Sequence, residues 1–220
     1  MKGLTFLSLL ASTAVAFRIP ADTPNGLFKD YYDENGTEVH VRLTVEMMKA
    51  DATKLFAAGL VDTETTESTI LLLARDNLTS EAAKYRRQYC ECGQSMDHSD
   101  CDDATDAVRE QIKEAGGAAL VPIDEGIYGT FNGVTSFICT PGDNEAVTPV
   151  TKEIYDAALG KSTAACGKYV PGVYVHGDMQ GQKKDGRGTS VEIGYKFNEK
   201  RSDILFCDHS RDPKEEKCRK

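Results

Sequence analysis

Residues 126–139 read GIYGTFNGVTSFIC and contain the clearest secondary-structure signal of the chain. Two runs rich in β-branched and aromatic residues flank Asn132-Gly133, a dipeptide typical of a two-residue hairpin turn. We therefore expect antiparallel strands over 126–131 and 134–139.

Helical and strand patterns alternate on both sides of the hairpin. A helix is predicted over 102–115, because its apolar residues share one face and Gly116-Gly117 end it. A second helix is predicted over 149–165, with Thr148 as its N-cap and Pro149 at its first position. Further strands are expected at 118–123, 170–176, 189–197 and 204–207. Helices and strands in this order predict an α+β domain.

The chain before residue 88 differs in composition, because all seven cysteines lie at position 90 or later. Within 17–87, a period-two alternation over 39–45 predicts a half-buried strand, and Asn35-Gly36 predicts a hairpin to a partner strand over 28–32. A helix is expected over 49–58. The sequence therefore divides into residues 1–16, a cysteine-free region 17–87 that is a candidate pro-segment, and a cysteine-rich domain 88–220 with a short polar tail.

The first 16 residues have the three parts of a secretory signal peptide. Lys2 supplies the positive charge, residues 4–10 form a short apolar core, and Ala14-Val15-Ala16 is a cleavage site of the small-x-small type. Cleavage after Ala16 would start the mature chain at Phe17. We expect a secreted, extracellular protein without a transmembrane segment.

Secretion makes disulfide pairing the default state of the cysteines. The seven cysteines allow three pairs and one unpaired thiol, and the connectivity stays open. Cys218 lies in the polar tail, so we expect it to be the odd thiol. The six expected to form disulfides are Cys90, Cys92, Cys101, Cys139, Cys166 and Cys207.

Two kinds of covalent processing are predicted for a chain in the secretory pathway. Asn35 and Asn77 each begin an Asn-x-Thr sequon for glycosylation. Arg86-Arg87 is a dibasic pair directly before the cysteine-rich domain, and cleavage after Arg87 would release the preceding region. An ordinary pair on a solvated helix is the alternative.

Composition argues against nucleic-acid binding. The chain has 35 acidic and 26 basic side chains and a formal net charge of −9, whereas phosphate binding needs a basic face. The acidic run over 97–103 is expected to cap a helix start. No cofactor or metal site is predicted.

An enzymatic alternative depends on four polar residues near the predicted C-terminal strands. They could form a small secreted ribonuclease site with a Glu/His acid–base pair and a cation for the phosphate. These candidates are His176, Glu192, Arg201 and His209. The alternative is that the histidines have no catalytic task. Neither HExxH nor GxSxG is present, so the chain lacks these zinc-protease and serine-hydrolase signatures.

The glycine-rich segment 177–188 carries Lys183, Lys184 and Arg187 between two predicted strands. Such a loop could bind an anionic partner, for example a lipid headgroup or a cell-wall polymer. A solvated linker is the alternative.

The cysteine-rich domain resembles a known family in its element order and cysteine placement. The features that carry the resemblance are the run 99–102 entering a helix, the strand 133–139 ending in cysteine, Ala165-Cys166-Gly167 after a helix, and the strands over 172–175 and 191–195. It is similar to the fungal killer-toxin-like secreted proteins, including the necrosis-inducing-factor branch of plant-pathogen effectors. The resemblance covers residues 90–207.

The resemblance implies a disulfide-stapled two-layer α/β sandwich with two helices on an antiparallel sheet. It also implies an effector or toxin that binds an unknown surface component of host or competitor cells and is not an enzyme. A secreted hydrolase such as a ribonuclease is the first alternative. A cell-surface structural protein of the producing organism is the second.

Overall fold

The computed structural model describes residues 17–20, 22–60, 88–140, 147, 149–178 and 189–198. Its helices are α1 (Val45–Ala57), α3 (His98–Glu114) and α4 (Lys152–Cys166). Its strands are β1 (Gly26–Tyr32), β2 (Glu38–Arg42), β3 (Gln88–Cys90), β4 (Ala118–Ala119), β5 (Glu125–Phe131), β6 (Val134–Thr140), β7 (Val150–Thr151), β8 (Gly172–Asp178) and β9 (Thr189–Phe197). The prediction of an α+β fold is confirmed.

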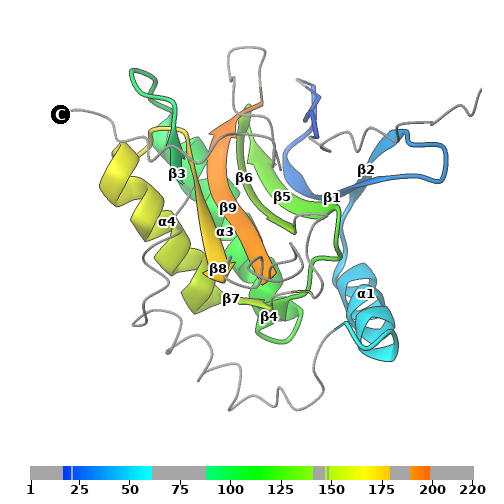
Figure 1. Ribbon diagram of the computed structural model, residues 1–220. Coiled ribbons are helices and arrows are strands. Elements are labelled where there is room, and N and C mark those ends of the chain that lie inside the picture. The colour runs from blue at the N-terminus through cyan, green and yellow to red at the C-terminus, as the bar shows by residue number, and fades with distance from the viewer. Residues whose placement is uncertain are drawn as a thin grey trace, which may run out of the picture.

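A seven-stranded antiparallel sheet has the order β2-β1-β5-β6-β9-β8-β3 (Figure 1). The predicted hairpin forms its centre, with Phe131 paired to Val134 across the Asn132-Gly133 turn. Both turn residues have positive φ, 43° and 84°, as the primed hairpin turns require. The local signal in residues 126–139 was therefore sufficient to specify this pairing.

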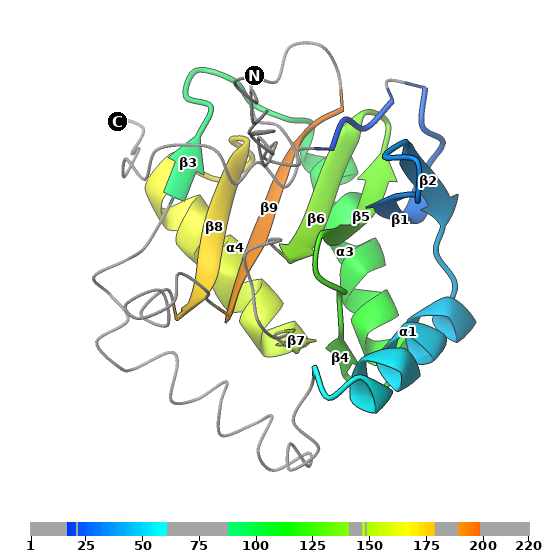
Figure 2. The same cartoon turned by 45° about the vertical axis from the view of Figure 1, so that its right-hand side comes forward.

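The helices α3 and α4 pack behind the sheet, as Figure 2 shows, while α1 lies below β1 and β2 in that view. The face that α3 and α4 cover carries Ile127, Ile138 and Ile193, whose side chains join those of both helices in one core cluster. The described residues thus contain three helices, because α1 adds one to the two in the cysteine-rich domain. An ideal Cβ on Gly129 would lie 2.6 Å from the Ala104 carbonyl oxygen, so glycine lets α3 approach β5 closely.

The opposite face of the sheet carries a second apolar cluster. Phe28, Tyr128 and Phe137 come from neighbouring strands, and Phe17 and Ile19 of the N-terminal segment pack on them. Phe17 is 1% exposed and stacks on Tyr32 with 4.9 Å between ring centroids. The first described residues are therefore part of the folded core.

The cysteine-free region shares the sheet with the cysteine-rich domain. The predicted hairpin of β1 and β2 is confirmed, with Asn35-Gly36 in its turn, and β1 also pairs with β5 over five residue pairs. The helix predicted over 49–58 begins earlier, at Val45, because Thr44 caps it by accepting a hydrogen bond from the Met47 amide. The strand expected at 204–207 lies outside the described residues.

Several predicted boundaries in the cysteine-rich domain differ from the structure. The strand predicted over 118–123 is limited to Ala118–Ala119, and the second helix begins at Lys152 with Thr151 as its N-cap. The helix starts late because Val150 and Thr151 pair with Ala119 and Ala118 as the strands β7 and β4. This short pairing keeps Pro149 out of the helix.

One disulfide has both of its cysteines among the described residues. It is Cys90–Cys166, which links the edge strand β3 to the end of α4. Cys92 and Cys139 are also disulfide-bonded. The disulfide predicted for Cys101 is wrong, because Cys101 is a free thiol and 3% exposed. The helix α3 starts at His98, four residues before the predicted start, and Cys101 lies on the buried face of its first turn. Cys207 and Cys218 lie outside the described residues.

Candidate functional site

A groove of ≈ 500 Å³ lies between α1 and the β1–β2 hairpin, and we call it the α1 groove. Apolar side chains form most of its wall, and the charged side chains come from three elements. The lining residues are Lys29, Tyr31, Val41, Met47, Ala50, Asp51, Lys54, Leu55, Pro122 and Glu125. An apolar concave surface with a few convergent polar groups has the composition of a ligand site.

Lys29 is the polar centre of the α1 groove and is 8% exposed. Its Nζ lies 2.6 Å from Asp51 Oδ2 on α1 and 2.5 Å from Glu125 Oε2 at the start of β5. Burial lowers the pKa of Lys29, but the two carboxylates outweigh burial and raise it above its usual value. Lys29 is therefore a protonated cation that ties three elements together, and it cannot act as a base or nucleophile at neutral pH.

The two carboxylates beside Lys29, those of Glu125 and Asp51, have different surroundings. Burial raises the pKa of Glu125, while the ion pair with Lys29 opposes that shift. Asp51 also lies 3.8 Å from the exposed Lys54, measured from Oδ1 to Nζ. Two cations thus face two carboxylates, so the α1 groove has little net charge and favours an uncharged or weakly polar ligand.

The other face of the same strands carries a chain of hydrogen bonds. Glu38 Oε1 lies 2.9 Å from His40 Nε2, and His40 Nδ1 lies 2.9 Å from the Tyr128 hydroxyl. This order matches the carboxylate–imidazole–hydroxyl series of hydrolytic triads. Burial and the carboxyl groups of Asp30 and Glu38 raise the pKa of Tyr128, and its side chain is 0% exposed. A protonated, enclosed phenol is a poor nucleophile, so this chain fixes β2 to β5.

Asp30 lies next to this chain and is the most unusual side chain in the sheet. It is 0% exposed, and neither carboxyl oxygen has a hydrogen-bond partner among the described residues. Burial, followed by the negative charge of Glu38, raises its pKa well above the usual value. The geometry therefore favours a neutral carboxylic acid at this position.

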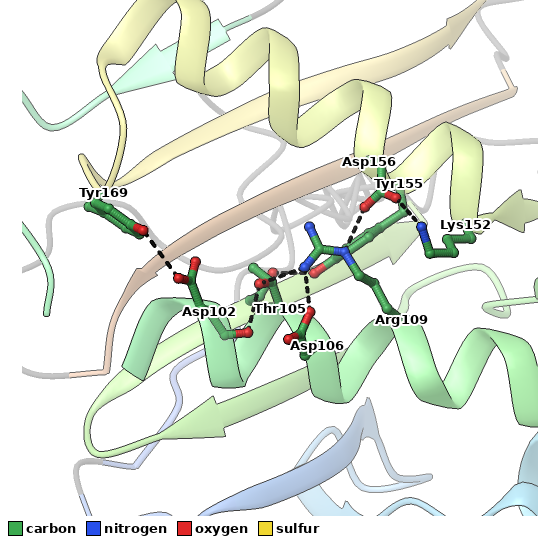
Figure 3. Close-up of polar contacts among 9 residues, drawn as sticks. Asp102, Thr105, Asp106, Arg109, Lys152, Tyr155, Asp156 and Tyr169 are labelled. Atoms are coloured by element: carbon green, nitrogen blue, oxygen red, sulfur yellow. Dashed lines mark hydrogen bonds and ion pairs between the residues drawn. The ribbon is translucent and has the colours of Figure 1, made fainter. Parts of the chain in front are cut away.

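A separate polar network joins α3 to α4 on the outside of the helix layer (Figure 3). Arg109 Nε lies 2.6 Å from Asp156 Oδ1, and its Nη1 lies 2.6 Å from Asp106 Oδ1. Lys152 completes the network with a 2.6 Å contact to Asp156 Oδ2. Arg109 Cζ also lies over the Tyr155 ring, 5.8 Å from the ring centroid. These contacts orient two helices and bring together no nucleophile and base.

The ribonuclease pair predicted from the sequence is not formed. His176 pairs with Val191 and Val175 pairs with Glu192, so alternation along the strands places His176 and Glu192 on opposite faces of the sheet. Both side chains are buried, at 7% and 6% exposed. Burial lowers the pKa of His176, which disfavours its charged form. Arg201 and His209 lie outside the described residues.

Most of the other predicted positions also lie outside the described residues: Ala16, Asn77, Arg87, Lys183, Lys184 and Arg187. Asn35 is exposed in the β1–β2 turn, and its glycosylation stays a prediction. The acidic run does cap a helix, because Asp97 Oδ1 accepts hydrogen bonds from the Ser99 and Asp100 amides at 2.9 and 3.2 Å. Within the described ranges, no group of three or more His, Cys, Asp or Glu residues could hold a metal ion.

Sequence reasoning missed the charged centre of the α1 groove. Lys29 and Asp30 are adjacent charges inside LFKDYY, an otherwise apolar and aromatic strand. Two adjacent charges in such a strand indicate that one charge is buried on each face of the sheet. The ion-pair partners of Lys29 could not be identified in this way, because Asp51 and Glu125 are distant in sequence. Their convergence depends on the pairing of β1 with β5.

The fold and the groove define an α+β protein with an antiparallel sheet and a disulfide that closes one sheet edge. No family model, curated protein or solved structure matches this chain. No helix among the residues that the structure covers is long and apolar enough to cross a membrane.

Proposed function

We propose that this protein is a secreted effector or toxin that binds a surface component of host or competitor cells through the α1 groove and is not an enzyme. The observation that carries the proposal is the groove itself: an apolar-walled concavity whose buried Lys29 is neutralised by Asp51 and Glu125. Such a site can bind a ligand but offers no activated nucleophile.

Secretion is supported by two independent features. Residues 1–16 have the pattern of a signal peptide, and disulfides persist in the oxidising compartments that such a peptide leads to. The bond between Cys90 and Cys166 closes the β3 edge against α4, which suits a small protein outside the cell. Cleavage after Ala16 would leave Phe17, the first residue of the apolar cluster, at the N-terminus.

We also propose how the helices are arranged on the sheet. We regard α3 and α4 as the two helices of a two-layer sandwich, as in the killer-toxin-like proteins that the cysteine-rich domain resembles. The helix α1, which follows β2, is an addition to that sandwich. This part of the proposal rests on the resemblance of residues 90–207 to that family in element order and cysteine placement. The toxin or effector role follows from this resemblance.

The test uses two arginine substitutions on exposed alanines of α1. Ala50 lines the groove, so Ala50→Arg would fill it with a long side chain. Ala57 is also exposed at the end of α1 but lies outside the groove, so Ala57→Arg is the matched control. Both variants add one positive charge to the same helix.

Fluorescently labelled full-length mature protein would be titrated onto intact cells and isolated walls of candidate hosts and competitors. We expect Ala50→Arg to weaken binding by at least about tenfold and Ala57→Arg to leave it unchanged. Equal binding by both variants would reject the groove as the binding site. Cleavage of a fluorogenic RNA that is lost in His176→Ala would instead reject the non-enzymatic proposal.

A further inference from the structure

The strand β2 forms an end of the sheet, and β1 is its sole partner among the described residues (Figure 1). An end strand presents unpaired amide and carbonyl groups that can pair with another strand. The opposite end, β3, is only three residues long and is tied to α4 through Cys90–Cys166. The β2 edge is therefore the longer and less constrained of the two.

Flanking hydrogen bonds determine which backbone groups of β2 point outward. The Leu43 amide donates to the Leu27 carbonyl at 3.0 Å, and the Asp33 amide donates to the Thr37 carbonyl at 3.0 Å. Hydrogen-bonded pairs alternate along an antiparallel ladder, so Val39 and Val41 face β1. The amide and carbonyl groups of Glu38, His40 and Arg42 therefore face away from the sheet.

The sequence of β2 is complementary to itself in one antiparallel register. Reading EVHVR against its own reverse places Glu38 opposite the partner's Arg42, Val39 opposite the partner's Val41, and His40 opposite the partner's His40. We propose that β2 pairs with β2 of a second copy of this chain about a two-fold axis at His40. The two sheets then join into one continuous sheet.

This register satisfies every outward-facing backbone group of the strand. The two copies of His40 exchange amide-to-carbonyl hydrogen bonds across the axis. Glu38 and the partner's Arg42 do the same on one side, and Arg42 and the partner's Glu38 do so on the other. Six backbone hydrogen bonds form in total, with one pair of bonds at each of the three positions. The interface is isologous, so it closes at a dimer.

Charge complementarity favours a second copy over other strands. Arg42 is exposed, and no carboxylate of the described residues lies within ion-pair distance of its guanidinium. Glu38 lies on the same face of β2, two positions before His40. The register gives Arg42 an acidic cross-strand neighbour at both ends of the interface, where opposite charges directly across from each other stabilise a sheet.

Reversing the charges of Glu38 and Arg42, singly and together, tests the proposed register, because only the double variant should restore dimerisation. Glu38→Arg places four arginines around the axis, and Arg42→Glu places four glutamates there, so both single variants oppose like charges. The double variant Glu38→Arg/Arg42→Glu restores an opposite-charge pair at both ends. Sedimentation velocity of the full-length mature protein would be measured over a hundredfold concentration range. We expect a monomer–dimer equilibrium for the unmodified protein and the double variant, and association at least about tenfold weaker for each single variant.

Amide hydrogen exchange of the unmodified protein gives a second test that needs no variant. The amides of Val39 and Val41 bond to β1 and should be protected at every concentration. The amides of Glu38, His40 and Arg42 should gain protection only as the dimer forms. A monomer at all concentrations, a double variant that stays monomeric, or protection of all five amides independent of concentration would overturn the proposal.

Discussion

Replacing Asp30 with asparagine tests the most unusual electrostatic feature of the sheet. Asp30 is 0% exposed, and its oxygens have no hydrogen-bond partner among the described residues. Burial, Glu38 and Glu125 raise its pKa, whereas its own backbone amide and the charge of Lys29 lower it. The net result is a pKa raised well above the usual value, so the folded protein holds a proton there that the unfolded chain releases.

Proton linkage gives the sign and the size of the effect. The folded pKa is above the unfolded pKa, so the stabilisation is fully present below the unfolded value of about 3.9 and is lost as the pH rises towards the folded value. Each pH unit in that window costs about 1.4 kcal/mol. As the pH rises above about 4, the unmodified protein should progressively lose stability relative to Asp30→Asn, which cannot release this proton, by at most about 1.4 kcal/mol per pH unit.

Urea unfolding of the oxidised protein at several pH values between 4 and 6 would measure this difference. Asp33→Asn in the adjacent turn is the matched control, because hydrogen bonds from the Thr37 and Asn35 amides lower the pKa of Asp33 and give its linkage the opposite sign. We expect the free energy of unfolding of Asp30→Asn to rise above that of the unmodified protein with increasing pH. Parallel curves for these two proteins would refute a neutral, buried Asp30.

Three further predictions concern packing and cysteine chemistry. Gly129→Ala should destabilise the fold by about 1–3 kcal/mol, because the new Cβ would lie 2.6 Å from the Ala104 carbonyl oxygen. Gly160→Ala on α4 should stabilise the fold by about 1 kcal/mol, because its Cβ would enter open space. Denaturant unfolding measures both free energies. Replacing Cys90 and Cys166 with alanine should cost about 4 kcal/mol in the same assay, since their disulfide spans 76 residues. Burial and the nearby Asp102 raise the pKa of the Cys101 thiol to about 12, so peptide mass spectrometry should find Cys101 alkylated by iodoacetamide only after unfolding.

The sequence predicted best the elements that depend on neighbouring residues. The Asn132-Gly133 hairpin and the strand Thr189–Phe197 agree with the structure, because turn chemistry and period-two alternation act over a few residues. The start of α4 was mispredicted because a distant pairing with Ala118–Ala119 takes Val150 and Thr151 into a strand. Local capping signals at Thr148 and Pro149 carried no information about that contact.

The candidate site was beyond sequence reasoning for the same reason. Lys29 meets Asp51 through the packing of α1, but it meets Glu125 only because β1 inserts between β2 and β5. That pairing joins segments almost one hundred residues apart. Strand alternation could reveal that Lys29 and Asp30 face opposite sides of a sheet, but it could not identify what covers either side.

The shared sheet also changes what cleavage after Arg87 would achieve. Removing residues 17–87 would strip away β1, β2 and α1, expose the edge of β5, and leave Glu125 without its ion pair to Lys29. It would also remove Phe17, Ile19 and Phe28 from an apolar cluster that includes Tyr128 and Phe137. A cut chain would therefore keep its N-terminal fragment bound through the β1–β5 ladder and this buried surface. A pro-segment that dissociates after cleavage must be able to separate from the domain without disrupting its sheet. Here β1 lies inside the sheet, between β2 and β5, so its removal would disrupt the sheet.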